Sequence, residues 1–341
     1  MLRCLELAQL GLGSTAPNPS VGCVVVHKSK IIGEGFTSPY GGNHAEVNAI
    51  NSVADPTLLP ESTIYVSLEP CAHYGKTPPC ANLIIDKKIK RAVVATLDPF
   101  AQVNGLGIQN MMKAGIDVTL GVLEDEAIEQ NRRFITFHEK KRPYIILKWA
   151  ETADGFVDNL RTKPSEPSLK ITCDASNILV HKWRAEEAAI MVGTNTAILD
   201  NPSLTTRKYE GKNPTRILLD ANLKTPENAN IFDNEVNTIV FHQKETESNS
   251  STKNIELVRV ENARDLSTLL KELHTRNIQS VIVEGGPSLH RSFYEAGLWD
   301  EIRRFISPSS IENGVAAMSI NESENEEYQV GCDRLLTYRN R

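Results

Sequence analysis

Short apolar runs alternate with amphipathic segments along roughly the first 140 residues, and this alternation limits the folds open to the chain. Runs bounded by turn residues indicate strands, whereas apolar residues three or four apart indicate helices. Because the strands are separated by helices, we expect a mixed or parallel sheet with helices on both faces, a three-layer α/β/α domain. The predicted strands are 21–27, 31–36, 63–68, 91–97 and 117–120, and the predicted helices are 2–12, 44–54 (capped by Asn43), 80–88, 109–114 and 124–137.

A charged stretch at 138–143 interrupts the pattern, and we interpret it as a domain boundary. The alternation then restarts, with strands predicted at 144–149, 188–192, 216–219, 238–241 and 281–283 and helices at 176–186 and 265–276. The polar, Ser-rich segment 244–254 is predicted to be a surface loop, and no regular structure is predicted for the acidic segment 312–328. A chain of 341 residues is long enough for about two domains, which we place at 1–141 and 142–341.

The composition argues against several classes of partner. A net charge of −6 gives no basic surface for nucleic acid. No stretch approaches the roughly 20 apolar residues that span a bilayer, and Glu6 lies where a secretory signal would be apolar. Six cysteines in a chain of this length do not suggest a disulfide framework. We therefore expect a cytoplasmic protein that binds neither nucleic acid nor membranes.

Four residues form a candidate zinc-dependent catalytic set. One His and two Cys can hold a catalytic zinc ion while leaving a fourth position for water, and His44, Cys71 and Cys80 are the candidate ligands. Zinc lowers the pKa of its water, and Glu46, two residues beyond His44, is the candidate proton shuttle. Nucleobase deaminases use a His-x-Glu motif followed by Pro-Cys-x-x-Cys. The set therefore predicts a hydrolytic deaminase.

Other interpretations of these residues stay open. His44 alone would more often be a surface histidine, and two cysteines nine residues apart are usually unrelated. A structural zinc site in a binding protein is one alternative, although it would need a fourth ligand that the sequence does not show nearby. A zinc deaminase of another nucleoside, base or tRNA, with an inactive or repurposed second domain, is another.

The spacing of the cysteines indicates a particular family. Eight residues separate Cys71 from Cys80, and the segment Pro-Cys-Ala-His-Tyr-Gly-Lys-Thr-Pro-Pro-Cys at 70–80 resembles the deaminase of bifunctional riboflavin biosynthesis proteins. Segments 16–22 and 42–46 are similar to that family too. The resemblance implies a cytidine-deaminase-like fold and, as substrate, 2,5-diamino-6-ribosylamino-4(3H)-pyrimidinone 5′-phosphate, which loses its 2-amino group. It also implies that four residues bind this substrate, namely Asn18, His73, Lys76 and Thr77.

The second half carries a glycine-rich turn at 283–289, between a predicted strand and a helix. Glycines there let the backbone approach a phosphate, although an ordinary strand-to-helix turn explains them about as well. This turn resembles part of the reductase that is fused to the deaminase in that family. Four further segments resemble the same reductase, namely 148–155, 192–196, 199–205 and 297–301. The resemblance implies a dihydrofolate-reductase-like α/β domain that uses NADPH to reduce the ribosyl side chain, giving 5-amino-6-ribitylaminouracil 5′-phosphate.

The resemblance also implies two sets of site residues in the reductase and, since relatives form oligomers, a homo-oligomer. The residues expected to contact NADPH are Ala150, Lys170 (where many members carry Trp), Thr172, Thr196, Asp200, Gly285, Gly286, Pro287, Ser288 and Leu289. The residues expected to line the substrate site are Lys148, Ser168, Arg184, Leu204, Arg207 and Glu284. The two arginines suit a substrate phosphate, yet either could equally be a surface residue. The resemblance runs from Leu2 to about Ser307 and is poor beyond it, and activity in only one half is a further alternative.

Overall fold

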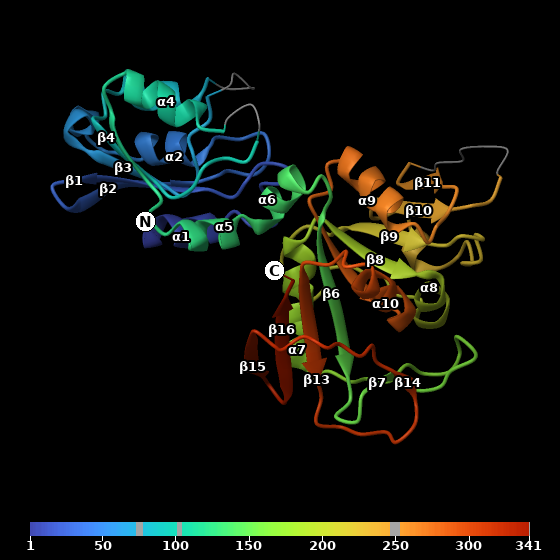
Figure 1. Cartoon of the computed structure of the whole chain (residues 1–341). Helices are drawn as coiled ribbons and strands as arrows, with labels where there is room; N and C mark the ends of the chain where they lie inside the picture. Colours follow the sequence, from blue (N-terminus) through green and yellow to red (C-terminus); the bar gives the residue numbers. More distant parts are fainter. Residues whose placement is uncertain (73–77, 101–103, 246–252, 341) are drawn as a thin grey trace. The chain divides into compact units, whose positions relative to one another are not determined.

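The computed structural model describes residues 1–72, 78–100, 104–245 and 253–340. The chain divides into two compact units, Met1–Lys141 and Arg142–Arg341 (Figure 1). Within the described ranges, no helix is both long enough and apolar enough to cross a membrane.

The first unit is built on a five-stranded sheet with the order β2-β1-β3-β4-β5. Strand β1 pairs antiparallel with β2 and β3, and β3, β4 and β5 are parallel. The strands are β1 (Gly22–His27), β2 (Lys30–Phe36), β3 (Thr63–Val66), β4 (Arg91–Val94) and β5 (Asp117–Leu120). The helices are α1 (Leu2–Gln9), α2 (Ala45–Asn51), the 3-10 helix η1 (Pro56–Glu61), α3 (Cys80–Asp86), α4 (Leu106–Lys113), α5 (Glu124–Gln130) and α6 (Arg132–Glu139).

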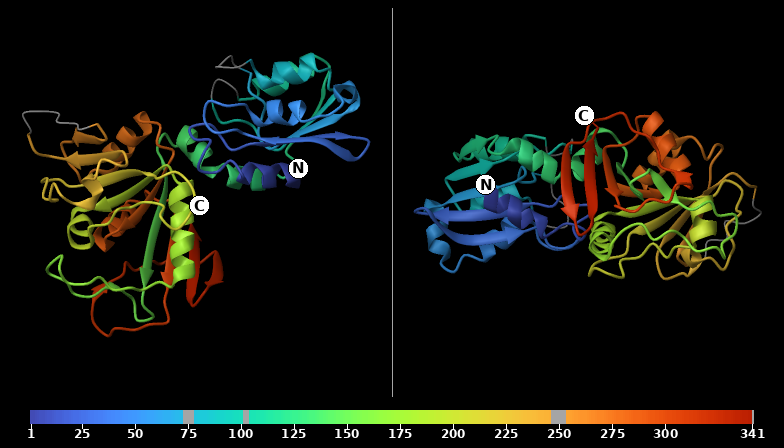
Figure 2. Two further views of the ribbon diagram at one scale, coloured as in Figure 1. Left: turned by 180° about the vertical axis from the view of Figure 1, so that it is seen from behind. Right: turned by 90° about the horizontal axis from the view of Figure 1, so that it is seen from below.

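Helices cover both faces of this sheet, with α2 and α4 on one side and α1 and α5 on the other in Figure 1 and in the left view of Figure 2. Strand β1 shows why both faces need a cover: successive side chains of a strand point to opposite faces, and those of β1 are apolar on both. Cys23 and Val25 join the core that contains α2, α3 and α4, whereas Val24 packs with Cys4 and Leu7 of α1. The expected three-layer α/β/α arrangement is therefore present.

Two local predictions in this unit are wrong. The N-cap of α2 is His44 and not Asn43, since His44 has the extended values φ −73° and ψ 163° and Ala45 begins the helix. The single helix predicted at 124–137 is instead the pair α5 and α6. Asn131 interrupts it with φ −103° and ψ 18°, and its Oδ1 accepts a hydrogen bond from the Ser20 N–H at 3.1 Å. A buried Asn that finds a partner outside the helix favours such a break.

The second unit contains a nine-stranded sheet with the order β11-β10-β9-β8-β12-β6-β13-β16-β15. The strands from β11 to β13 are parallel to one another, and β16 and β15 add an antiparallel hairpin at one edge. The strands are β6 (Tyr144–Glu151), β8 (Ala189–Gly193), β9 (Thr215–Leu219), β10 (Thr238–His242), β11 (Ile255–Arg259), β12 (Ser280–Gly285), β13 (Glu301–Ile306), β15 (Glu326–Val330), β16 (Asp333–Arg339) and a separate pair, β7 (Phe156–Asp158) with β14 (Val315–Ala316). The helices are α7 (Asp174–Glu186), α8 (Thr194–Asp200), the 3-10 helix η2 (Asn230–Phe232), α9 (Leu266–Thr275) and α10 (Pro287–Glu295).

The central strands of this sheet are buried on both faces. In β6, Ile145 and Leu147 pack into the core with α9 and α10, whereas Tyr144 and Ile146 face the core that contains α7 and α8. All four side chains are at most 4% exposed. Continuous apolar runs are typical of parallel strands covered by helices on both sides, and they made these strands predictable.

The acidic segment 312–328, for which no regular structure was predicted, contains β14 and the start of β15. Strand β15 is the outermost strand of the sheet, and Glu326 and Glu327 are exposed. Its pairing partner β16 carries the buried residues Leu335, Leu336 and Tyr338. Charged side chains on an edge strand discourage pairing with another chain. Because they also interrupt the apolar pattern by which strands are predicted, this strand was missed.

Candidate functional site

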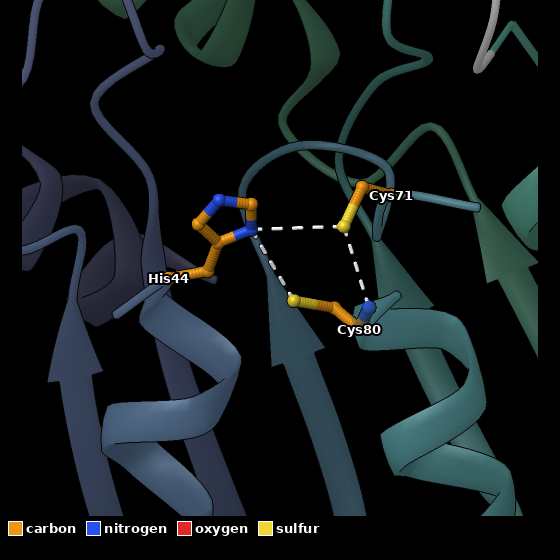
Figure 3. Close-up of side chains that lie close together, drawn as sticks. All are labelled: His44, Cys71 and Cys80. Carbon is orange, nitrogen blue, oxygen red and sulfur yellow. Dashed lines mark hydrogen bonds between the residues drawn. The ribbon is translucent and has the colours of Figure 1, made fainter. Parts of the chain in front are cut away.

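Three side chains of the first unit converge at the ends of two helices. His44 caps α2, Cys71 lies in the segment that follows β3, and Cys80 is the first residue of α3. The Nδ1 atom of His44 lies 3.6 Å from the Cys71 Sγ and 3.4 Å from the Cys80 Sγ (Figure 3). The backbone N–H of Cys80 donates to the Cys71 Sγ at 3.3 Å.

This cluster fits a zinc ion. Zinc–sulfur and zinc–nitrogen bonds of about 2.3 and 2.1 Å in tetrahedral geometry place neighbouring donor atoms about 3.6 Å apart, as found here. The hydrogen bond with Cys80 lowers the pKa of Cys71 to about 4, outweighing burial, and His44 acts in the same direction. Among the described residues, the cluster has three ligands and no fourth. That count matches a catalytic site with one open position better than a closed structural site.

Glu46 lies in the first turn of α2 and is 4% exposed. The Cys71 and Cys80 thiols and His44 all act on the pKa of its carboxyl group, which places that group beside the cluster. Burial, followed by the charge of Cys71, raises the pKa of Glu46 to about 7. The structure thus places the predicted proton shuttle against the predicted metal ligands.

The four residues expected to bind the deaminase substrate are only partly described. Asn18 is half-buried in the loop between α1 and β1, where its backbone N–H donates to the Thr15 carbonyl at 2.9 Å. His73, Lys76 and Thr77 lie outside the described residues.

Glu69 is a residue of this site that the sequence interpretation missed. It is 3% exposed and lies two residues before Cys71. Its two carboxylate oxygens accept backbone N–H groups from the segment before α4 and from the first turn of that helix: Gly105 and Gly107 at 2.8 Å, and Asp98 and Ile108 at 3.3 Å. The signal available in the sequence was a charged residue placed directly after a buried strand.

The second unit holds a pocket of about 1160 Å³, large enough for a dinucleotide and a small substrate. It is lined by nine of the ten residues expected to contact the cofactor and by three of the six expected to contact the substrate. These are Ala150, Thr172, Thr196, Asp200, Gly285, Gly286, Pro287, Ser288 and Leu289, with Lys148, Ser168 and Glu284.

The glycine-rich turn lies between β12 and α10, at one wall of this pocket. Gly285 has a φ of +135°, which side chains of L-residues rarely adopt. A Cβ on Gly286 would approach the Thr196 Oγ1 to 3.3 Å. Gly286 is also the N-cap of α10; Pro287 has no N–H and the Leu289 N–H donates to the Gly286 carbonyl at 2.9 Å, which leaves the Ser288 N–H of the first turn for a ligand. This backbone suits the phosphates of a nucleotide.

A buried cluster of three charges forms another part of the wall. Arg184 donates from Nε and one terminal nitrogen to the two carboxylate oxygens of Glu284, at 2.9 and 2.7 Å, and Lys148 Nζ lies 3.8 Å from the same carboxylate. Burial raises the pKa of Glu284, but the charges of Arg184 and Lys148 outweigh it and hold the pKa at about 2. Glu284 is therefore a carboxylate at neutral pH.

Four predicted residues do not line this pocket. Lys170 is exposed and pairs with Asp174 at 3.9 Å, and the Arg184 guanidinium pairs with the Glu284 carboxylate. Leu204 is buried, and Arg207 is exposed with one terminal nitrogen 3.1 Å from the Thr205 hydroxyl.

Arg161 lines the pocket although the sequence interpretation did not single it out. It binds the Asp158 carboxylate at 2.6 Å, the Leu199 carbonyl at 3.0 Å and the Asp200 carboxylate. The sequence around Arg161 is polar and has no helical or strand periodicity, so nothing in it indicated that this residue belongs to the site.

The fold and its two sites define a class: a zinc deaminase unit joined to a nucleotide-binding α/β unit. Comparison with known sequence families agrees with this division. Residues 1–96 match the cytidine and deoxycytidylate deaminase zinc-binding region, and residues 143–338 match the RibD C-terminal domain. The second match extends well beyond Ser307, where the resemblance was expected to become poor.

Relatives cover most of the chain. Riboflavin biosynthesis protein RibD of Aquifex aeolicus is 41% identical over 93% of this chain and 88% of its own length, and that of Bacillus amyloliquefaciens is 39% identical over 95% and 87%. The crystal structure of a diaminohydroxyphosphoribosylaminopyrimidine deaminase/5-amino-6-(5-phosphoribosylamino)uracil reductase from Thermotoga maritima is 35% identical. It has a TM-score of 0.90 and covers 99% of this chain and 97% of the other.

The chain belongs to the RibD family of bifunctional riboflavin biosynthesis enzymes, which join a deaminase to a reductase. The expected family, fold class and enzyme class are thereby confirmed. Membership implies zinc in the first unit and a nicotinamide cofactor in the second.

Proposed function

We propose that the chain catalyses two successive steps. The first is hydrolytic deamination of 2,5-diamino-6-ribosylamino-4(3H)-pyrimidinone 5′-phosphate, and the second is NADPH-dependent reduction of the ribosyl side chain to give 5-amino-6-ribitylaminouracil 5′-phosphate. The observation that carries the proposal is the cluster of His44, Cys71 and Cys80 with the buried Glu46 beside it. The names of the relatives support the choice of substrates.

In the first step, water replaces the amino group on the ring carbon and ammonia leaves. His44, Cys71 and Cys80 would hold zinc, which lowers the pKa of a coordinated water towards neutrality. The Glu46 carboxylate accepts a proton from the attacking water and delivers one to the departing amine. Burial keeps this carboxylate out of bulk water, so its proton stays with the reacting groups.

In the second step, residues of the pocket would bind the cofactor and the substrate and orient them toward each other. The Ser288 N–H at the start of α10 and the turn at Gly285 and Gly286 would bind the cofactor phosphates. Bound NADPH supplies the hydride to the sugar carbon C1′. Lys148 and Glu284 would hold the polar substrate against the wall, and Arg184 fixes the position of Glu284. Arg264 also lines the pocket, and a guanidinium suits the 2′-phosphate that distinguishes NADPH from NADH.

The test is to incubate the zinc-loaded protein with the diaminopyrimidinone substrate while ammonia release and NADPH absorbance are followed together. Ammonia release followed by NADPH oxidation is the expected result, with both products identified by mass spectrometry. Ammonia without NADPH oxidation would overturn the second step and favour a deaminase with a silent second unit. If neither signal appears with zinc bound, the substrate assignment is wrong, and free nucleosides are the next candidates.

We also propose that the enzyme works in the cytoplasm as a homo-oligomer on small molecules, without a nucleic-acid or membrane partner. The net charge of −6 supports the absence of a polyanionic partner. Light scattering coupled to size-exclusion chromatography measures the mass of the assembly, and a monomer at micromolar concentration would contradict the oligomer.

A further inference from the structure

Two cysteines of the second unit lie close together, and neither of them lines the pocket. Cys173 is the N-cap of α7, and Cys332 lies in the turn between β15 and β16. Their Sγ atoms and a carboxylate oxygen of Asp333 all lie within 4.8 Å of one another. The red hairpin lies beside the yellow-green helix α7 in Figure 1 and in the left view of Figure 2.

Hydrogen bonds fasten this turn to the start of α7. The Asp333 carboxylate accepts the backbone N–H of Cys173 at 2.9 Å and the Ser176 hydroxyl at 2.6 Å, so it caps the helix from another part of the chain. The Cys173 thiol donates to the Val330 carbonyl at 3.4 Å. The Cys332 thiol lies 3.6 Å from the other carboxylate oxygen of Asp333, and because Asp333 is fully buried, these contacts hold the turn beside the start of α7.

The turn contains the glycine that such a close approach requires. Gly331 has a φ of +60°, and a Cβ there would lie 2.7 Å from the Cys173 Sγ and 3.2 Å from the Ala175 Cβ. Any side chain at this position would push the turn away from Cys173.

The two thiols are accessible and lie outside the zinc cluster, a combination that none of the other four cysteines has. Cys4 and Cys23 are fully buried, and Cys71 and Cys80 belong to the zinc cluster. Cys173 is partly exposed and Cys332 is exposed. The backbone N–H of Ser176, at the start of the helix, is the main cause that lowers the pKa of Cys173, so this thiol supplies the better nucleophile.

We propose that Cys173 and Cys332 are a redox-active pair that forms a reversible intramolecular disulfide. With a peroxide as oxidant, the Cys173 thiolate attacks one oxygen and becomes a sulfenic acid, and the other oxygen leaves as water. The Cys332 thiol then attacks the Cys173 sulfur, and the sulfenic oxygen leaves as a second water. Two thiols and one hydrogen peroxide thus give one disulfide and two waters, and a dithiol reductant reverses the change.

The cluster suits a disulfide better than a metal ion. One oxygen of Asp333 already accepts two hydrogen bonds, and the cluster offers no fourth ligand among the described residues. The disulfide would tether the hairpin to α7 next to Thr172, which lines the pocket.

The test uses the full-length, zinc-loaded protein, treated with hydrogen peroxide and digested with trypsin without reduction. We expect the chain to lose the mass of two hydrogens and to yield residues 171–182 linked to residues 305–334. Cys173→Ser and Cys332→Ser should each abolish the linked peptide, and dithiothreitol should restore the starting mass. Oxidation of thiols without this linkage, or linkage only between chains, would overturn the proposal, as would a second tightly bound zinc that protects both thiols.

A second pair of variants tests the geometry without removing a cysteine. Gly331→Ala should slow formation of the linked peptide by about tenfold or more, since disulfides tolerate little change in the separation of their cysteines. Gly297→Ala is the matched control, because Gly297 has a similar φ of +64° but nothing within 4 Å of its added Cβ. Equal rates for the two variants would contradict the geometry that the proposal requires.

Discussion

The guanidinium of Arg184 donates to both carboxylate oxygens of Glu284 inside the second unit, and neither side chain is more than 12% exposed. The two residues are 100 positions apart in the sequence. Removing one charge leaves the other buried without its partner, which typically costs about 3–5 kcal/mol. Because Glu284 also lines the pocket, a substitution that breaks this pair should both destabilise the reductase unit and alter the pocket wall.

The low pKa of Glu284 predicts how this unit responds to acid. The folded state holds the pKa at about 2, below the ordinary 4.5, so the ionised carboxylate adds stability above pH 4.5. That stability, about 3 kcal/mol, is lost as the pH falls from 4.5 through 2. Glu284→Gln lacks this contribution, so its free energy of unfolding should fall less steeply over the same range.

Urea unfolding followed by tryptophan fluorescence measures this effect. All three tryptophans, Trp149, Trp183 and Trp299, lie in the second unit, so the signal reports that unit alone. Glu295→Gln, on the exposed end of α10, is the control and should behave like the unmodified protein. Equal slopes for Glu284→Gln and the unmodified protein between pH 5 and about 2.5 would refute the assignment.

Replacing Glu46 should separate metal binding from catalysis. We expect Glu46→Ala and the more conservative Glu46→Gln to retain one zinc per chain, because the three ligands are unchanged, while deamination falls by about 10²–10⁴-fold. Zinc content is measured by mass spectrometry of the metal, and deamination by ammonia release. Reduction of the deaminated intermediate should continue at the normal rate. Substantial ammonia release by either variant would rule out the proton-shuttle role.

Removing His44 should have the opposite signature. His44→Ala deletes the Nδ1 ligand, so both zinc and deamination should be lost, whereas reduction of the deaminated intermediate should persist in the second unit. His27→Ala is a matched control in the same unit, since His27 pairs with Glu61 at 3.5 Å and lies outside the cluster. A full complement of zinc in His44→Ala would show that the cluster is not the metal site.

Local patterns predicted the central strands well because burial on both faces makes their sequences continuously apolar, as in Ile145, Ile146 and Leu147. The zinc ligands were predictable for another reason. His44, Cys71 and Cys80 belong to residue types with few other uses in that order, and the chemistry of zinc demands them.

Features that arise only from long-range contacts were not predictable. Arg184 was interpreted as a phosphate ligand, but nothing near it in the sequence reveals its pairing with Glu284. The edge strand β15 carries Glu326 and Glu327, so its sequence lacks the apolar pattern of a strand. It is recognised as a strand in the structure because it pairs with β16. Asn43 has the better cap chemistry, yet the structure begins the helix one residue later, after His44.

Glu69, which the sequence did not single out, provides the last prediction. Its buried carboxylate accepts four backbone N–H groups, and Glu69→Ala would leave them without this acceptor. Unsatisfied buried donors cost about 1–3 kcal/mol each, so we expect the first unit to lose at least about 3 kcal/mol.

Hydrogen exchange gives the most direct measurement of that loss. The amides of Gly105, Gly107 and Ile108 should exchange about 100-fold faster or more in Glu69→Ala, since about 1.4 kcal/mol corresponds to a factor of ten. Glu126→Ala, at an exposed position of α5, is the control and should leave their exchange unchanged. Because Glu69 lies two residues before Cys71, zinc should also dissociate faster from Glu69→Ala. Unchanged exchange at these amides would mean that the segment keeps its position without the carboxylate.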